Sequence, residues 1–179
     1  MSKRKKGTIA ELIRDKPRRG RPRRAVSRQN VYVSLTLDQK QVIQSMVGRL
    51  PGELVRADIP DLSIYLLSVR LEVLRLAVAD RNREIPEGIT DLESLYLLWD
   101  LPLPSDNGEG KWTSIRLSPQ RVIELGRAGG VLNAIFGVNR SQVFSLSLIL
   151  FDQFLDNDLE SVESTSLDDV IELITRIYL

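Results

Sequence analysis

One pattern of alternating apolar and polar residues occurs twice in this sequence, and it constrains the fold more than any other feature. Leu37 corresponds to Leu117 and Val42 to Val122, so the two copies lie 117 − 37 = 80 residues apart. Strict alternation predicts a strand with one buried and one exposed face. In the first copy the apolar face contains Val31, Val33, Leu35 and Leu37, and the opposite face contains Tyr32, Ser34 and Thr36. In the second copy the inner face contains Thr113, Ile115 and Leu117, and the opposite face contains Trp112, Ser114 and Arg116.

Each predicted strand is followed by two predicted helices. After the first strand we expect helices over residues 38–49, with Asp38 as the N-cap, and over residues 60–80. After the second strand, Ser118 and Pro119 suit the N-cap and first-turn positions of a helix. The expected segments are a first strand-helix-helix unit over residues 29–80, a connector with a short helix over 81–110, a second unit over 111–157, and an acidic segment with a C-terminal helix over 158–179.

The last helix of the second unit opens with the run Gly137-Val138-Asn139-Arg140-Ser141. With the polar-faced strand, the capped helix and the loop before it, residues 112–155 resemble the ribbon-helix-helix family of DNA-binding proteins. Residues 31–79 resemble the same strand and helices, but Ile59-Pro60-Asp61 stands where Val138-Asn139-Arg140 does. The resemblance implies a mainly α fold in which two units pair their strands antiparallel, and the ribbon enters the major groove of DNA. Because both units lie in one chain, we expect an intrachain pseudo-dimer.

The resemblance also implies which side chains meet the DNA bases. They are those on the outer ribbon face, of which Arg116 is the strongest candidate because its fork can bond a guanine edge. The alternative is that these residues are ordinary solvated positions, and that Tyr32 and Trp112 pack at the ribbon ends. The candidate base readers are Tyr32, Ser34, Thr36, Trp112, Ser114 and Arg116.

The start of the last helix of the second unit is a candidate phosphate site. Asn139, Arg140 and Ser141 combine free backbone amides, a positive helix end and side-chain donors. A plain N-cap explains the same residues. In the first unit Asp61 would repel a phosphate, so we expect the two half-sites to be held unequally.

The N-terminal segment carries an unusual charge. Residues 1–28 contain 12 Lys or Arg against Glu11 and Asp15, a balance of 12 − 2 = +10, so the remaining residues carry −9 of the formal +1. Such asymmetry is typical of a disordered arm that binds nucleic acid, although a solubility feature or a nuclear import signal gives the same charge.

The core of this arm, residues 16–24, resembles an AT-hook. In that motif arginines point into the negative potential of a narrow A·T-rich minor groove, glycine permits close approach and proline keeps the chain extended. The resemblance assigns minor-groove contacts to Arg18, Arg19, Gly20, Arg21, Pro22, Arg23 and Arg24.

Composition excludes several classes of chemistry. The chain has no Cys and no His, so thiolate nucleophiles, structural zinc sites and imidazole acid-base catalysis are absent, and we expect neither an enzyme nor a bound cofactor. It has no uncharged apolar window of membrane-spanning length, and its basic N-terminal residues lack a following apolar stretch, so we expect no secretory signal. We therefore expect a soluble protein with no membrane contact, located in the cytoplasm on the nucleoid, or in the nucleus of a eukaryotic cell.

The C-terminal residues 166–179 predict an amphipathic helix with a capping box formed by Ser166 and Asp169. Its apolar stripe is expected to dock on the body of the chain, with a protein partner as the alternative. The segments 62–78 and 143–155 are apolar on nearly every side, which favours homo-oligomerisation.

These features favour a transcriptional regulator that binds double-stranded DNA, acting as a repressor that occludes a promoter. Two alternatives remain at this stage. An architectural or segregation protein would grip DNA backbone and shape with little sequence preference. An antitoxin-like adaptor would use the acidic C-terminal segment to hold a partner protein, although antitoxins of this family usually carry one unit.

Overall fold

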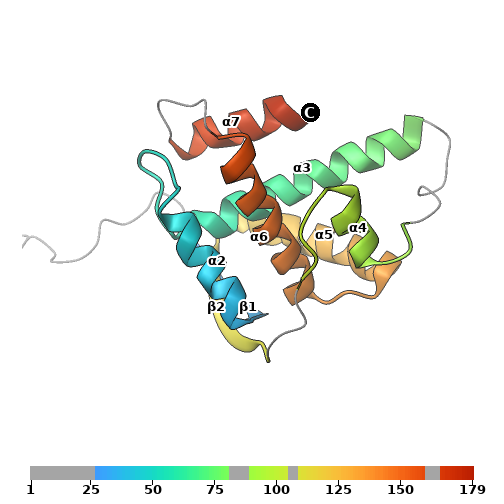
Figure 1. The fold of residues 1–179 in the computed structure, drawn as a ribbon, viewed down its shortest axis with the longest axis horizontal. Coiled ribbons are helices and arrows are strands. Elements are labelled where there is room, and N and C mark those ends of the chain that lie inside the picture. The colour runs from blue at the N-terminus through green and yellow to red at the C-terminus, as the bar shows by residue number, and fades with distance from the viewer. Residues whose placement is uncertain (1–26, 81–88, 105–108, 160–165) are drawn as a thin grey trace, which may run out of the picture.

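The two predicted strands lie side by side in the computed structural model, which describes residues 27–80, 89–104, 109–159 and 166–179. The described part is mainly helical, with one antiparallel sheet of two strands (Figure 1). Its elements are β1 (Gln29–Leu35), α2 (Leu37–Val47), α3 (Ile59–Asp80), α4 (Leu92–Leu98), β2 (Lys111–Leu117), α5 (Pro119–Phe136), α6 (Arg140–Asn157) and α7 (Leu167–Tyr178).

The register of the ribbon matches the sequence repeat. Val33 lies opposite Thr113, and 113 − 33 = 80, so at the centre of the ribbon a residue pairs with its own counterpart in the other unit. The pairs Val31 with Ile115 and Leu35 with Lys111 lie on either side of that centre. The strands are therefore related by a local pseudo-twofold axis, and the predicted antiparallel pairing within one chain is confirmed.

The inner face of the ribbon is buried, as the alternation predicted. Val31, Val33 and Leu35 of β1 lie in the core with Ile115 and Leu117 of β2. Leu37 is the exception, since 69% of its surface is exposed. Its placement on the buried strand face was wrong because the chain already turns into α2 at this residue.

Thr36, not Asp38, is the N-cap of α2. The Thr36 hydroxyl accepts a hydrogen bond from the backbone N–H of Gln39, and the Gln39 side chain accepts one from the backbone N–H of Thr36. This reciprocal capping box satisfies two helix-end donors at once. Ser118 holds the predicted N-cap position of α5, but its side chain makes no capping hydrogen bond.

The two units interlock through their helices. Helix α2 of the first unit packs on α6 of the second, and α5 of the second unit packs on α3 of the first. Helices α3 and α6 also pack on each other across the middle of the molecule (Figure 1). Burial between the two units accounts for most apolar residues of 143–155 and for those in the first half of 62–78, whereas Val73 and Leu76 farther along α3 are 36% and 41% exposed.

Helix α7 docks on the body of the same chain. Val170, Leu173 and Ile174 are buried, α7 packs on α3, and the Tyr65 hydroxyl lies 2.6 Å from the Thr175 hydroxyl. The predicted capping box between Ser166 and Asp169 is present. The apolar stripe is therefore covered mainly by the chain itself, rather than left free for a partner protein.

Arg70 joins α3 to two other elements. Its guanidinium carbon lies 5.3 Å from the ring centre of Trp99 and 4.9 Å from that of Tyr178, which is cation–π geometry. Burial lowers the pKa of Arg70. Burial, and a hydrogen bond donated to Asp158, raise the pKa of the Tyr178 hydroxyl. Trp99 directly follows α4, the short helix expected within the connector.

Among the described helices, none alone is long and apolar enough to cross a membrane. Helices α5 and α6 meet that criterion only as a pair, and they are bent by 109° relative to each other.

Truncation of a core side chain on α7 tests whether this helix is part of the fold. Ile174 is fully buried, so Ile174→Ala should lower the free energy of unfolding by about 2–5 kcal/mol. Ile177 on the same helix is 41% exposed, and Ile177→Ala should cost less than about 1 kcal/mol. Urea denaturation of both variants measures the difference. Equal small losses would show that α7 is not docked in solution.

Candidate nucleic-acid interface

The outer face of the ribbon carries two exposed aromatic side chains. Tyr32 is 64% exposed and Trp112 is 75% exposed, so neither is packed at a ribbon end. They occupy equivalent positions, since 112 − 32 = 80. Large aromatic side chains at paired, solvent-facing positions are unusual for a surface that binds nothing.

The remaining outer residues differ in how free their side chains are. Arg116 lies opposite Asn30, and its Nε donates a long hydrogen bond of 3.4 Å to the Asn30 side chain. Arg116 makes no other hydrogen bond or ion pair with the described part of the chain. Ser114 is exposed opposite Tyr32, and Ser34 is half-buried opposite Trp112. The ribbon therefore presents its aromatic and arginine side chains outward.

Thr36 does not belong to this face. It lies beyond the end of β1, and its hydroxyl caps α2. It was expected on the outer ribbon face, but α2 begins two residues earlier than expected, so Thr36 lies at the start of the helix rather than on the strand. The outer face therefore keeps Tyr32, Ser34, Trp112, Ser114 and Arg116 of the six candidates.

The ribbon is free of acidic residues. Neither strand contains Asp or Glu, and β2 contributes Lys111 and Arg116. This absence stands out because residues 29–179 carry a net charge of −9. The face accordingly suits an anionic partner better than the rest of the described body does.

The N-terminus of α6 lies against β1. The Ser141 hydroxyl accepts a hydrogen bond of 2.8 Å from the backbone N–H of Ser34. The Asn139 side chain accepts hydrogen bonds from the backbone N–H groups of Ser141 and Gln142, at 2.9 and 3.1 Å. These two side chains are therefore occupied by the fold. Of the three phosphate candidates, only Arg140 has an exposed side chain that makes no hydrogen bond or ion pair with another described residue.

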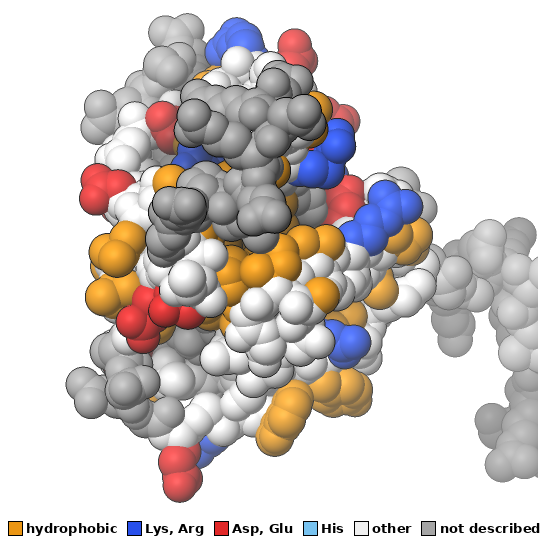
Figure 2. Space-filling model, turned by 90° about the vertical axis from the view of Figure 1, so that its right-hand side faces the viewer, with side chains coloured by type: hydrophobic (Ala, Val, Ile, Leu, Met, Phe, Trp, Pro, Cys, Tyr) orange, Lys and Arg blue, Asp and Glu red, His pale blue; other side chains and the backbone are white. Residues whose placement is uncertain are grey.

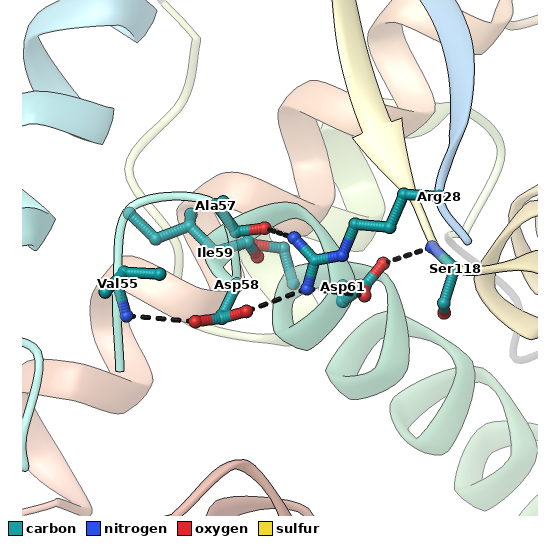
Figure 3. Close-up of polar contacts among 8 residues, drawn as sticks. Arg28, Val55, Ala57, Asp58, Ile59, Asp61 and Ser118 are labelled. Carbon is teal, nitrogen blue, oxygen red and sulfur yellow. Dashed lines mark hydrogen bonds and ion pairs between the residues drawn. The ribbon is translucent and has the colours of Figure 1, made fainter. Parts of the chain in front are cut away.

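At the equivalent position of the first unit, the structure contains a buried ionic cluster (Figure 3). The Nη2 atom of Arg28 lies 2.7 Å from Oδ1 of Asp58 and 3.1 Å from Oδ2 of Asp61. The Nη1 atom of Arg28 donates a hydrogen bond to the backbone carbonyl of Ala57. All three charged side chains are about nine-tenths buried.

The carboxylates of this cluster also bind backbone amides. Asp61 accepts a hydrogen bond of 2.9 Å from the N–H of Ser118, and Asp58 accepts one of 2.9 Å from the N–H of Val55. At the repeat offset of 80 residues, Asp61 is the counterpart of Ser141 and not of Arg140, opposite which the sequence comparison placed it. Each of the two accepts a backbone hydrogen bond from the other unit. Asp61 thereby holds the start of α3 at the end of β2, and Ser141 holds the start of α6 against β1.

This cluster changes two expectations from the sequence. Arg28 was assigned to the arm, yet it is a buried part of the fold. Asp61 was expected to face a phosphate, yet its carboxylate points inward and is paired with Arg28. The only sequence signal was the spacing of Asp58 and Asp61 at the start of a helix, and nothing local identified Arg28 as their partner.

The minor-groove candidates Arg18, Arg19, Gly20, Arg21, Pro22, Arg23 and Arg24 lie outside the described residues. The described chain begins at Ser27, and Arg28 fixes that point next to Ser118 at the end of β2 (Figure 3).

Comparison of the chain with protein-family models, curated proteins and solved structures gave no match. Across the described residues, no group of three or more Asp or Glu side chains is placed to hold a metal ion.

Removal of the buried cation tests the ionic cluster. Arg28→Met should lower the free energy of unfolding by about 3–5 kcal/mol, because two buried carboxylates lose their counter-charge. Arg75→Met is the matched control, since Arg75 pairs with Glu72 on the exposed surface of α3 and its loss should leave stability unchanged. Both are read from urea midpoints, and similar midpoints would mean that the cluster does not stabilise the fold.

Proposed function

We propose that this chain binds double-stranded DNA by placing the β1–β2 ribbon in the major groove, as a ribbon-helix-helix pseudo-dimer built from one polypeptide. The observation that carries the proposal is the outer ribbon face. It is exposed, free of acidic residues, and centred on a local pseudo-twofold axis. The major groove is about 12 Å wide and admits a two-stranded ribbon.

Each outer side chain has a distinct role in this proposal. Arg116 binds a guanine edge, since most of its guanidinium donors are free. Tyr32 and Trp112 make apolar contacts with thymine methyl groups or sugars at equivalent points of the two half-sites. Ser34 and Ser114 contribute single hydrogen bonds. Because Thr36 and Arg116 are equivalent positions, only the second half-site receives an arginine contact.

The helix ends beside the ribbon supply unequal phosphate contacts. Arg140 at the start of α6 is free to approach a phosphate, with no acidic residue in the first turn. At the start of α3 one buried arginine faces two buried aspartates, so this end offers no net positive charge. We therefore expect a binding site whose two halves differ in sequence and in affinity.

In this proposal the N-terminal arm makes a second contact with the DNA. It joins the fold at Arg28, beside the end of the ribbon, and its AT-hook-like core would follow the adjoining A·T-rich minor groove.

The biological role that fits best is a transcriptional repressor acting on the nucleoid or in a nucleus, without catalytic activity. An architectural or segregation protein is the main alternative, since shape and backbone contacts would use the same surface. The antitoxin-like alternative is weaker, because the stripe of α7 that would hold a partner is largely buried on α3.

Site selection from random duplexes followed by footprinting tests base reading. We expect a short protected site, and Arg116→Ala should cost about 1–3 kcal/mol of binding free energy and relax the preference at one guanine. Arg176→Ala, which removes another exposed cation from α7, should leave affinity unchanged. Broad protection without a preferred sequence would favour the architectural role, and no binding at all would refute the proposal.

Deletion of residues 1–26 tests the arm while leaving Arg28 in place. The deletion removes 12 − 1 = 11 Lys or Arg. The slope of log affinity against log salt should fall by roughly 0.9 for each phosphate contact that the arm makes. Binding measured from 50 to 200 mM salt gives the slope, and an unchanged slope would show that the arm does not touch the DNA backbone.

A further inference from the structure

An apolar cavity of about 440 Å³ opens between α3 and α5. Its walls are formed by the C-terminal half of α3 and most of α5, with Leu95 of α4 and Ile89 also contributing. Figure 2 views the molecule from the side on which α4 and the end of α3 lie, and hydrophobic side chains gather there. The cavity takes no part in the proposed DNA interface.

The interior of this cavity contains almost no polar group. Leu71, Leu74, Leu132 and Phe136 line it, and Val131 stands exposed among the lining side chains. Its volume falls within the roughly 300–1,000 Å³ typical of small-molecule sites, which are mostly apolar with a few placed polar groups. Its shape and lining therefore suit an apolar ligand.

Among the described charged residues around the cavity, one arginine has no acidic partner. Glu72 is paired with Arg75 at 2.6 Å. Glu124 is paired with Arg121, which also lies 4.3 Å from the ring centre of Tyr65. Arg127 lines the cavity as well, but it forms no ion pair or hydrogen bond with any described residue. A ligand with a single negative charge would complement this arrangement.

We propose that this cavity binds a small amphipathic carboxylate, with its apolar chain between α3 and α5 and its carboxylate at Arg127. Burial of the chain supplies most of the binding free energy, at about 0.8 kcal/mol for each CH₂ group. Arg127 selects for the charge of the head group. The inference rests on the cavity and its charges, and it holds whether or not the ribbon binds DNA.

Calorimetric titration with dodecanoate, 1-dodecanol and dodecylamine tests the proposal on the full chain, each ligand being kept below its aggregation limit. We expect one dodecanoate per chain, and weaker binding of the alcohol and the amine. Arg127→Gln should weaken dodecanoate binding about tenfold and remove its advantage over the alcohol, while Arg127→Lys should restore it.

Two tryptophan variants of α5 separate the cavity from the rest of the surface. Val131→Trp should fill the mouth and abolish binding. Ile123→Trp should bind normally, since Ile123 is exposed on the same helix but does not line the cavity. Circular dichroism checks that each variant is folded.

Three results would overturn the proposal. One is the absence of dodecanoate binding to the unmodified chain, and another is equal binding to the unmodified and Val131→Trp chains. The third is a dimer in sedimentation without ligand that Val131→Trp dissociates, because the cavity would then be an interface with a second copy.

Discussion

The antiparallel pairing of β1 with β2 is the contact on which the rest of the structure depends. A two-stranded sheet is marginal in water, so this ribbon persists only because its inner face rests on helices from both units. The pairing in turn brings the start of α3 to the end of β2, and the start of α6 to β1. Segments 80 residues apart thereby form one core, and the other face of the ribbon is left exposed.

The symmetry of the ribbon does not extend to the helix starts that flank it. At equivalent positions the chain uses a neutral hydroxyl, Ser141, and a charged carboxylate, Asp61, for similar backbone hydrogen bonds. The carboxylate requires a buried partner, and Arg28 supplies it. The last residue of the predicted arm is consequently fixed in the fold. One end of the proposed interface keeps a free cation, while the other has its charges turned inward.

Local patterns in the sequence predicted most of the fold and part of the candidate site. Alternation located both strands, and the repeat spacing predicted their pairing, because a ribbon centred on equivalent residues follows from two similar units. Two capping patterns overlap at the start of α2, Thr36 with Gln39 and Asp38 with Gln41, and local sequence did not show that the first is the one used. Nor could they show the Arg28 cluster or the cavity beside α5, because both join segments that are distant in sequence.

Pairing of the two strands within one polypeptide has a consequence for how the molecule responds to its own abundance. A ribbon assembled from two separate chains dissociates on dilution, so its folding is tied to protein concentration. Here the partner strand is always covalently present, and ribbon formation is a unimolecular step. Occupancy of a target would then rise in simple proportion to the number of molecules at low saturation, without the threshold that a dissociating dimer imposes. The two strands are also different segments of the sequence. A substitution in one strand therefore changes one half of the ribbon, whereas in a homodimer it would change both.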